Sequence, residues 1–417
     1  MFSGKTLMTA PNSTLLQDLR TLPGAFWVLC SGTFINRFGT FVYPFLTIAL
    51  SRRGVALWEI GIILAGYSVG GLVAMLAGGW FADRFGRRRT IVFGTAFQAV
   101  AVMALYFAEA PMVLALLTTS AGFFGGFYHP AANALVADLV PAERRLTAYA
   151  ALRQAANGGF AFGVAAGGLL VNWSPFWLFA GDALTTALFG VIAFLALPEG
   201  HRVSGSEARW SEAIGRIRRD GAFWALFAAQ FAAAFVFAQF ATSYALEIAR
   251  RGVSLSVAGW ALTPEQVYGL LMGLNGVMIM TLELPLTRVS TVFRPRRVMA
   301  FGYVLIGLGF AANLADFGAG FLAVGMAIFT LGEMLVIPMV NVWISHLAPG
   351  NMRGRYIGTL GMSWALGNIV GQNLGLKVFA ISPEALWLSC AAAGFAAAAM
   401  ITLLGRGRAA VGVPQPA

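Results

Sequence analysis

The chain has 417 residues, of which 59% are hydrophobic and only 11% are charged, and its mean hydropathy is +0.75. A water-soluble protein carries about 25% charged residues, so this composition excludes an ordinary soluble domain and indicates a membrane protein. Both cysteines lie inside apolar runs, which excludes a disulfide framework. The net charge of +11 comes from arginines dispersed between apolar runs, a pattern that fits membrane topology and not a nucleic-acid surface.

Twelve apolar runs, numbered here as spans 1 to 12, are long enough to cross about 30 Å of hydrocarbon. A polar interval, residues 198–221, separates an N-terminal bundle (1–197) from a C-terminal bundle (222–417). Within it, Trp210, Ile214 and Ile217 share one helical face, which predicts an amphipathic helix on the cytoplasmic membrane surface. A solvated linker is the alternative. The spans are expected at 24–50, 58–80, 90–110, 112–136, 147–171, 175–197, 222–246, 266–290, 297–316, 320–346, 355–380 and 384–405.

Positive charge is divided unevenly between the two sides of these spans. With an even number of spans, both termini share one side, and 21 of the 28 Lys and Arg residues fall there. Five fall on the opposite side, and Arg37 and Arg153 lie within spans. Because basic residues accumulate in cytoplasmic loops, we expect a multi-pass protein of the cell's inner (plasma) membrane with both termini in the cytoplasm. No small-residue cleavage site follows span 1, so no removable signal peptide is expected.

The two halves also repeat short patterns at matching places. The segment 88–94 after span 2 and the segment 296–302 after span 8 both read Arg-Arg-x-x-x-Phe-Gly. The loops after spans 4 and 10 both read Pro-x-x-x-Arg, at 141–145 and 349–353. These coincidences predict a duplicated six-helix unit.

The loop after span 2 resembles the G-x-x-x-D-R-x-G-R-R signature of the major facilitator superfamily. This resemblance implies an all-α membrane protein with twelve transmembrane helices in two pseudo-symmetric six-helix bundles, working as a monomer by alternating access. It also implies that the loop is a cytoplasmic gate, in which Asp83 approaches the start of span 11 near residues 354–358. On the alternative interpretation the arginines only set topology and Asp83 caps a helix. The signature positions are Gly79, Asp83, Arg84, Gly86, Arg87 and Arg88.

Two further patterns point to one branch of that superfamily. Span 5 is similar to the G-x-x-x-G-P-x-x-G-G signature of proton-driven exporters, with Val164 in place of the proline. Residues 36–39 of span 1, Asn-Arg-Phe-Gly, followed by Pro44, resemble the first-span pattern of the twelve-span drug:proton antiporters. Span 4 lacks the arginine that many proton-coupled members carry there. The span-5 glycine motif consists of Gly159, Gly163, Gly167 and Gly168.

Charged side chains within spans are the functional candidates, because each costs at least about 2.5 kcal/mol at the bilayer centre unless it is compensated. Glu333 of span 10 and Arg37 of span 1 lie near the middle of spans that line the central cavity in the superfamily. An opposite charge favours the ionised form of a carboxyl group and desolvation favours the protonated form. We therefore predict Glu333 as the main proton site, with Arg37 as its partner or as the ligand of an anionic substrate group. Glu283 and His129 are further proton-coupling candidates.

The same charges have a purely structural interpretation, in which a permanent Arg37–Glu333 or Arg153–Glu283 ion pair only compensates buried charge. Asp182 in the outer third of span 6 is a further buried charge. Polar and aromatic side chains within the spans are the candidates for the walls of a substrate cavity. These substrate-cavity candidates are Asn36, Arg37, Tyr43, Arg153, Asn157, Gln239, Asn341 and Trp343.

No phosphate-binding loop, nucleophile–base arrangement or Cys/His cluster occurs, so we expect neither an enzyme nor a bound cofactor or metal. The favoured function is proton-coupled efflux of small hydrophobic or amphipathic compounds, with the solute, protons and membrane lipids as partners. Arg37 and the scarcity of carboxylates argue against a preference for lipophilic cations.

Two alternatives stay open. One is a proton-coupled symporter that imports a peptide or organic acid, because Gly332-Glu333 followed by Pro338 is similar to a pattern of peptide:proton symporters. Asn36 replaces the glutamate that those symporters carry before Arg-Phe. The other is a non-transporting sensor built on the same fold.

Overall fold

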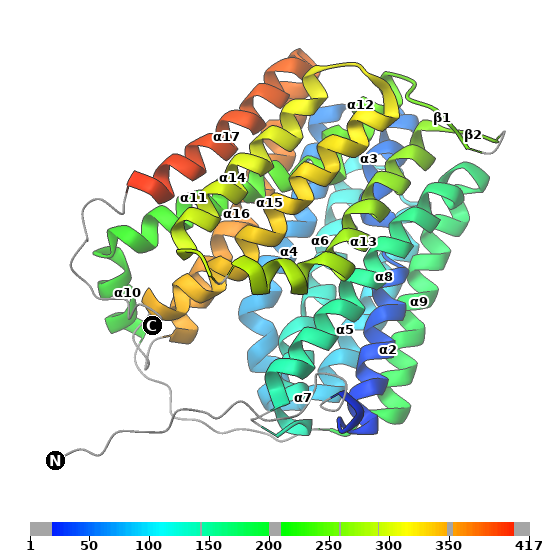
Figure 1. Ribbon diagram of the computed structural model, residues 1–417. Helices are drawn as coiled ribbons and strands as arrows, with labels where there is room; N and C mark the ends of the chain where they lie inside the picture. Colours follow the sequence, from blue (N-terminus) through cyan, green and yellow to red (C-terminus); the bar gives the residue numbers. More distant parts are fainter. Residues whose placement is uncertain are drawn as a thin grey trace.

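The structure, a computed structural model, describes residues 19–141, 144–199, 210–257, 260–290, 292–347 and 353–403. It is almost entirely helical (Figure 1). In the described part of the chain, ten helices are long and apolar enough to cross a membrane. The other two predicted spans correspond to span 1, which a break divides, and to span 11, a 29-residue helix that carries polar residues such as Gln372 and Lys377.

The first six spans follow one another with short connections. Span 1 is α2 (Gly24–Phe38) and α3 (Val42–Arg52), and span 4 is α6 (Pro111–Gly126) and α7 (Tyr128–Leu139). The remaining helices of this half are α4 (Leu57–Phe85), α5 (Arg87–Phe107), α8 (Arg145–Trp173) and α9 (Pro175–Ala196).

The second half begins after the short helix α10 (Trp210–Arg218), which lies in the polar interval. The amphipathic helix on the cytoplasmic membrane surface stays a prediction. Span 7 contains a π-helical turn, η2 (Phe240–Tyr244), between α11 (Gly221–Ala238) and α12 (Ala245–Arg250). The other helices are α13 (Pro264–Ser290), α14 (Pro295–Ala311) with the 3-10 turn η3 (Ala312–Leu314), α15 (Gly318–Leu347), α16 (Arg353–Ile381) and α17 (Pro383–Leu403).

A short hairpin is the one departure from the all-helical expectation in the described chain. Strands β1 (Leu255–Val257) and β2 (Trp260–Leu262) pair antiparallel, with Leu255 opposite Leu262. The hairpin connects α12 to α13 and lies at the upper edge of the molecule in Figure 1. A hairpin this short satisfies its backbone groups outside the hydrocarbon, where open strand edges are tolerated.

Proline marks where several membrane helices begin. It fixes a helical φ and lacks the N–H that the first helical turn would leave unpaired, so it is favoured at the first position of a helix. A helix in the hydrocarbon can therefore start at a proline without an extra unsatisfied donor. The helices that begin in this way start at Pro111, Pro175, Pro264, Pro295 and Pro383.

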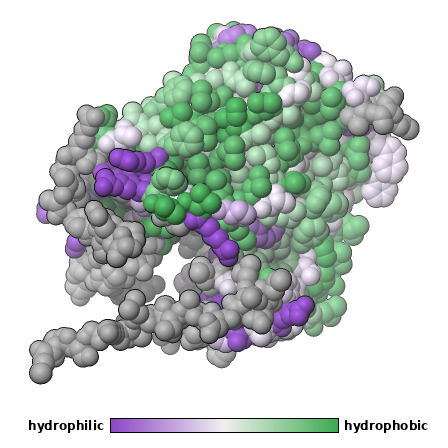
Figure 2. Space-filling model, viewed as in Figure 1, coloured by the Kyte–Doolittle hydropathy of each residue, from purple (hydrophilic) through white to green (hydrophobic). Residues whose placement is uncertain are grey.

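The two halves pack as bundles and meet along two pairs of helices. α4 packs against α16, and α8 packs against α13. In Figure 1 the helices of the first half stand nearly upright and those of the second half are oblique, so the two sets converge toward the top. One face of the molecule is a broad apolar surface with hydrophilic residues toward its ends (Figure 2), as lipid contact requires. The limits of the bundles at residues 197 and 222 stay predictions.

We call the membrane side that carries the α4–α5 connection the inner side and the other the outer side. On the outer side, a repeat that the sequence analysis missed supports the duplication. Spans 1 and 7 both end in Arg-Arg-Gly-Val, at 52–55 and 250–253, with positive φ at both glycines. Arg53 donates to the carbonyls of Ala108 and Tyr106 at the end of span 3. Arg251 donates in the same way to the carbonyls of Ala315 and Asn313 at the end of span 9.

Candidate functional site

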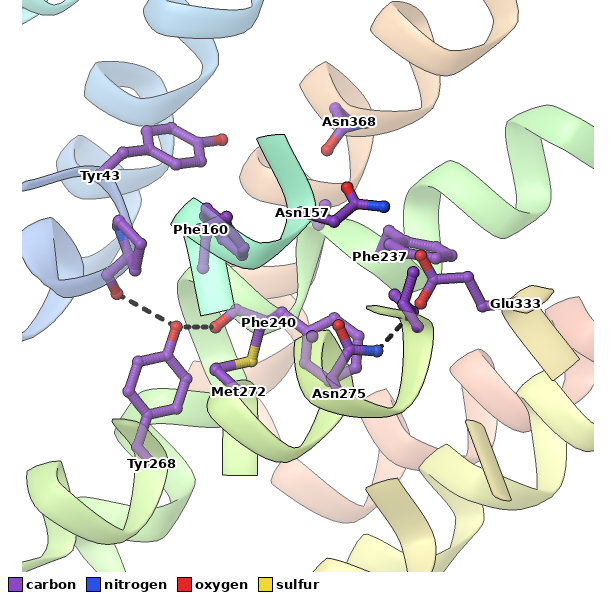
Figure 3. A pocket seen from close by; sticks show the side chains of 15 residues that line it. Tyr43, Asn157, Phe160, Phe237, Phe240, Tyr268, Met272, Asn275, Glu333 and Asn368 are labelled. Carbon is purple, nitrogen blue, oxygen red and sulfur yellow. Dashed lines mark hydrogen bonds between the residues drawn. The ribbon is translucent and has the colours of Figure 1, made fainter. Parts of the chain in front are cut away.

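A cavity of about 210 Å³ lies between the two bundles. The first half contributes α3 and α8, and the second half contributes α11, η2, α13, α15 and α16 (Figure 3). Helices from both halves therefore build one site, as alternating access requires. The lining residues are Tyr43, Pro44, Asn157, Phe160, Phe237, Ala238, Phe240, Ala241, Tyr268, Met272, Asn275, Gly276, Ile279, Glu333 and Asn368.

Glu333 is the one acidic or basic side chain among the described residues that line this cavity. It projects from α15 toward α13, where Asn275 Nδ2 donates to its Oε2 over 3.0 Å (Figure 3). The same amide nitrogen lies 2.9 Å from Thr330 Oγ1. One amide hydrogen bond compensates a buried negative charge only in part, so Glu333 gains from binding a proton or a cation.

The walls around Glu333 are mainly aromatic and apolar. Phe160, Phe237 and Phe240 face the cavity together with Met272 (Figure 3). The amides of Asn157, Asn275 and Asn368 add neutral oxygens and N–H donors. Apolar walls with few polar groups and one charge suit a small amphipathic solute.

The outer end of the cavity is closed by contacts between spans 1, 7 and 8. The Tyr268 hydroxyl donates to the carbonyls of Phe240, over 2.9 Å, and Pro44, over 3.3 Å (Figure 3). Thr47 Oγ1 donates to the carbonyl of Ala241 over 2.6 Å. A π-turn releases carbonyls from their helical pairing, which is why η2 offers acceptors at this place.

Further polar contacts join the bundles on the same side. Gln372 Nε2 of α16 donates to the Tyr43 hydroxyl over 2.5 Å, and Arg52 forms an ion pair with Glu265 at the start of α13. Asn172 of α8 donates to Thr263 Oγ1 over 2.6 Å. The described structure is therefore sealed on the outer side.

Toward the inner side, an ion pair between described residues links the two bundles. Arg153 Nη1 of α8 lies 2.7 Å from Glu283 Oε1 of α13. The Glu283 side chain is 4% exposed and that of Arg153 is 40% exposed. Glu283 Oε2 has no hydrogen-bond partner among the described residues. The contact agrees with the purely structural interpretation of these residues, in which Arg153 and Glu283 form an ion pair between spans.

Arg37 contacts His129 and not Glu333 in this structure. Its Nη2 lies 2.7 Å from His129 Nε2, where α7 begins. A guanidinium has only donors, so this hydrogen bond requires the neutral tautomer of His129 with its proton on Nδ1. Neither side chain is among the described residues that line the cavity, so the expected meeting of Arg37 and Glu333 is not observed.

The remaining cavity candidates divide into those that line the cavity and those that do not. Tyr43 and Asn157 line it, whereas Asn36 and Asn341 do not. Gln239 is fully buried within the second bundle, where it donates to the carbonyl of Gly371, and Trp343 stacks under Arg296 with 5.2 Å from Cζ to the ring. Burial inside a bundle, or contact with a loop arginine, removes these side chains from the shared cavity.

The loop signature has a clear structural basis at Gly86. This residue has φ +98° and ψ 157°, a conformation that only glycine adopts at low cost. A Cβ there would also meet the side chain of Glu199, which follows span 6. Gly86 thus allows α4 to end and α5 to begin with a single residue between them.

The signature arginines are tied to carboxylates at the ends of other spans. Arg88 Nε lies 3.0 Å from Glu199 Oε2, and the backbone N–H of Arg87 donates to the Glu199 carbonyl over 3.1 Å. The Arg87 side chain is buried and lies 3.6 Å from Asp138 at the end of α7. The exposed Arg84 lies against the ring of Trp80. These contacts fix the loop to its own bundle.

The gate prediction itself falls outside the described residues. The surroundings of Gly79 and the side chain of Asp83 are not described, and neither are residues 348–352 before span 11. The approach of Asp83 to span 11 therefore stays a prediction.

We expect Gly86→Ala to lower the stability of the protein by about 1–3 kcal/mol, because an alanine must adopt a strained φ at this position. The readout is the unfolding temperature of the purified protein in detergent. Gly320→Ala is the matched control, since a Cβ at Gly320 has no atom within 4 Å and φ there is not positive. Equal unfolding temperatures for the two variants would contradict this account of the loop.

The span-5 glycines hold α8 close to two neighbours. A Cβ at Gly159 would lie 2.5 Å from the Phe34 carbonyl oxygen of α2. One at Gly168 would lie 2.9 Å from the Glu265 carbonyl oxygen of α13, across the interface between the bundles. Gly163 faces the backbone of Phe38, and Gly167 faces aromatic rings of span 1. The motif therefore lets backbones approach, as small residues do in membrane helices.

The chain is similar in sequence to known membrane transporters along most of its length. A sequence model of the Major Facilitator Superfamily matches residues 29–264 and residues 261–416. The Na(+), Li(+), K(+)/H(+) antiporter of Planococcus maritimus is 28% identical over 364 residues, which are 81% of this chain and 85% of that protein. Multidrug resistance protein 2 of Bacillus subtilis is 23% identical over 365 residues, which are 85% of this chain and 88% of that protein.

Solved structures support the same fold. A POT family transporter in complex with 5-aminolevulinic acid superposes with a TM-score of 0.78 at 15% identity, over 94% of this chain and 99% of that one. A nucleoside transporter superposes with a TM-score of 0.74 at 13% identity, over 94% of this chain and 100% of that one. At these identities the likeness shows the fold alone. Because the family matches extend from span 1 to the end of the chain, this protein belongs to the Major Facilitator Superfamily, whose members are transporters and not enzymes.

Proposed function

We propose that this transporter exports small amphipathic compounds in exchange for protons. The observation that carries the proposal is the cavity between the bundles, in which Glu333 is the one charged side chain among the described lining residues. Contacts with Tyr268, Thr47 and Gln372 close its outer end. The cavity is thus a single site that both halves share, with a titratable group inside it.

The exchange follows from charge compensation. An ionised carboxylate in a site of low dielectric is costly, and either a proton or a cationic group of the solute removes the cost. Both ligands neutralise the same oxygens of Glu333, so binding of one opposes binding of the other. If the bundles move only when Glu333 is neutralised, the transporter carries protons in one direction and solute in the other.

The cavity also bears on the class of solute. Its volume of about 210 Å³ lies below the ~300–1,000 Å³ of sites for drug-sized ligands, which favours small solutes in this conformation. The expectation against lipophilic cations rested on Arg37 and on the scarcity of carboxylates, and Arg37 is not among the described lining residues. Aromatic walls and a carboxylate favour a neutral or cationic solute. Similarity to two multidrug resistance proteins of Bacillus subtilis supports this proposal.

Exchange of a monovalent metal cation for protons is a second candidate. Similarity to the Na(+), Li(+), K(+)/H(+) antiporter of Planococcus maritimus favours it. The amide oxygens of Asn157, Asn275 and Asn368, which line the same cavity as Glu333, are the hard ligands that such a cation needs. Proton-coupled import of a peptide or organic acid has less support, because the likeness to POT structures is one of fold and Asn36 replaces the symporter glutamate.

The remaining features belong to the same proposal. We place both termini and the loop that contains Asp83 on the cytoplasmic side, where this loop forms the inner gate. We also propose that the protein functions as a monomer. The arginines Arg87 and Arg88, held by Asp138 and Glu199, would keep the loop rigid while the bundles move.

Everted membrane vesicles with an acidic interior test the proposal. We expect a panel of small amines and cationic amphiphiles to dissipate the pH gradient when this protein is present, and sodium, lithium and potassium salts to do so if the second candidate holds. Vesicles with empty vector are the control. Further acidification of the vesicle interior when a compound is added would indicate symport. No response to any compound or salt would contradict proton exchange.

A further inference from the structure

The outer half of span 1 is a separate helix whose inner end is held by a buried carboxylate. The chain breaks at residues 39–41, after α2 and before α3. The first N–H of α3, that of Val42, donates to Asp182 Oδ2 of α9 over 3.0 Å. Asp182 is 5% exposed. A negative charge at the N-terminus of a helix is stabilised by the helix dipole and by its free N–H groups.

The same helix carries most of the first bundle's part of the outer closure. Thr47 donates to Ala241 of η2, and the Pro44 carbonyl accepts from Tyr268 of α13. Arg52, at the end of α3, pairs with Glu265. The outer side cannot open unless α3 separates from spans 7 and 8, so whatever holds α3 controls that opening.

A small second cavity, of about 20 Å³, lies against Asp182. This is enough for about one water molecule, which could bring a proton to the carboxylate. The wall includes Thr40 and Tyr67, and α5 and α6 add the neutral Gln98 and Thr118. Asp182 is the one acidic or basic residue among the described residues of this wall.

Few charged or titratable groups face Asp182 from the helices around it. The tyrosines Tyr43 of α3 and Tyr67 of α4 line the same cavity. Arg53, after α3, lies 5.8 Å from the ring of Phe179, one turn from Asp182. The helices packed against α9 are α2, α3, α5 and α8. Their other arginines are Arg37 in the last turn of α2, Arg52 in the last turn of α3, Arg87, Arg88 and Arg89 at the inner end of α5, and Arg145 and Arg153 in the inner third of α8.

We propose that Asp182 is a second protonation site, and that its charge controls the position of α3. When it is ionised, Asp182 attracts the start of α3 and holds the outer side closed. When it is protonated, the attraction between charge and helix dipole is lost, and α3 can swing about residues 39–41. Asp182 is thus a positioning residue for the outer gate. It lies outside the described lining of the solute cavity and acts separately from the exchange proposed at Glu333.

Cysteine labelling from outside the cell tests the proposal without any solute. The parent protein carries Thr47→Cys with Cys30→Ala and Cys390→Ala, and it is treated with a membrane-impermeant maleimide at acidic and at alkaline pH. Each labelling rate at position 47 is divided by the labelling rate of Glu109→Cys at the same pH, which removes the pH dependence of the thiol itself. Glu109 is exposed in the α5–α6 connection. We expect labelling at position 47 of the parent to be about threefold to tenfold faster at acidic pH.

Asp182→Asn has the same shape as the protonated residue and is expected to label at the fast rate at both pH values. Thr118→Val is the matched control, because Thr118 lines the same small cavity but bonds to Leu114 of its own helix. It should keep the pH dependence of the parent. Labelling of the parent that does not change with pH would overturn the proposal, and so would a pH dependence that persists in Asp182→Asn. The pH dependence of labelling in the parent tests the proposal even if Asp182→Asn does not reach the membrane. Since no solute is present, either outcome leaves the exchange at Glu333 to its own test.

Discussion

Glu333→Gln is expected to abolish proton-driven movement of solute while solute-for-solute exchange continues. Glutamine keeps the shape of the side chain and an oxygen that accepts from Asn275, but it cannot ionise. The solute gradient that a pH gradient supports should fall by about 5–150-fold, the range that a coupling free energy of ~1–3 kcal/mol covers. The measurement is solute uptake into proteoliposomes with an imposed pH gradient, compared with counterflow in its absence.

Glu109→Gln is the control for this substitution, because Glu109 is exposed in the connection between α5 and α6. It should support both uptake and counterflow. If Glu333→Gln still accumulates solute in response to the pH gradient, Glu333 does not carry the coupled proton. If it loses counterflow as well, the residue is needed for binding or movement and not for coupling alone.

Arg153→Met should destabilise the protein by about 3 kcal/mol. Breaking a buried pair costs ~3–5 kcal/mol because a charge is left uncompensated, and the partial exposure of Arg153 puts the effect at the lower end of this range. Adding Glu283→Gln should restore most of the loss, because the neutral amide needs no counter-ion. Unfolding temperatures in detergent for the wild type, both single variants and the double variant give the interaction energy.

Arg297→Met, at an exposed arginine in the first turn of α14, controls for the loss of a positive charge alone. It should leave the unfolding temperature almost unchanged. Additive effects of Arg153→Met and Glu283→Gln would contradict the ion pair as a link between the bundles.

Most of the architecture could be predicted because it depends on quantities that a sequence carries directly. The length of each apolar run sets the number of spans, and the arginine asymmetry predicts their orientation. The breaks in spans 1 and 4 were missed, because mean hydropathy does not change at a break. Local signals were present: Gly39 lies directly against Thr185 of α9, and His129 is followed by Pro130 where α7 begins.

The candidate site could be predicted in part. Tyr43, Asn157 and Glu333 line the cavity, since polar side chains in apolar spans usually face protein or water and not lipid. Tyr268 and Asn368 were missed, because the face that a long helix turns toward the cavity is set by its packing with other helices. Depth along a span placed Arg37 near Glu333 but could not show which helix it faces.

The other omissions concern residues at the ends of spans. Glu199 and Asp138 hold the signature arginines. Asp182 was identified only as a buried charge in the outer third of span 6, and its contact with the start of α3 was not predicted. A carboxylate that closes an apolar run, next to a loop rich in arginine, is the signal that could have pointed to the first two. No pattern in the sequence relates Asp182 to Val42, because 140 residues separate them.

The central claim is that proton and solute compete for Glu333 in the cavity between the bundles. The most direct measurement is proton release from the purified protein in a weakly buffered solution when a transported solute is added. The account predicts that solute binding releases protons from the wild type, with an amplitude that saturates as the solute does, and that Glu333→Gln binds solute without releasing any. Solute binding to the wild type without proton release, or equal release from both proteins, would contradict it.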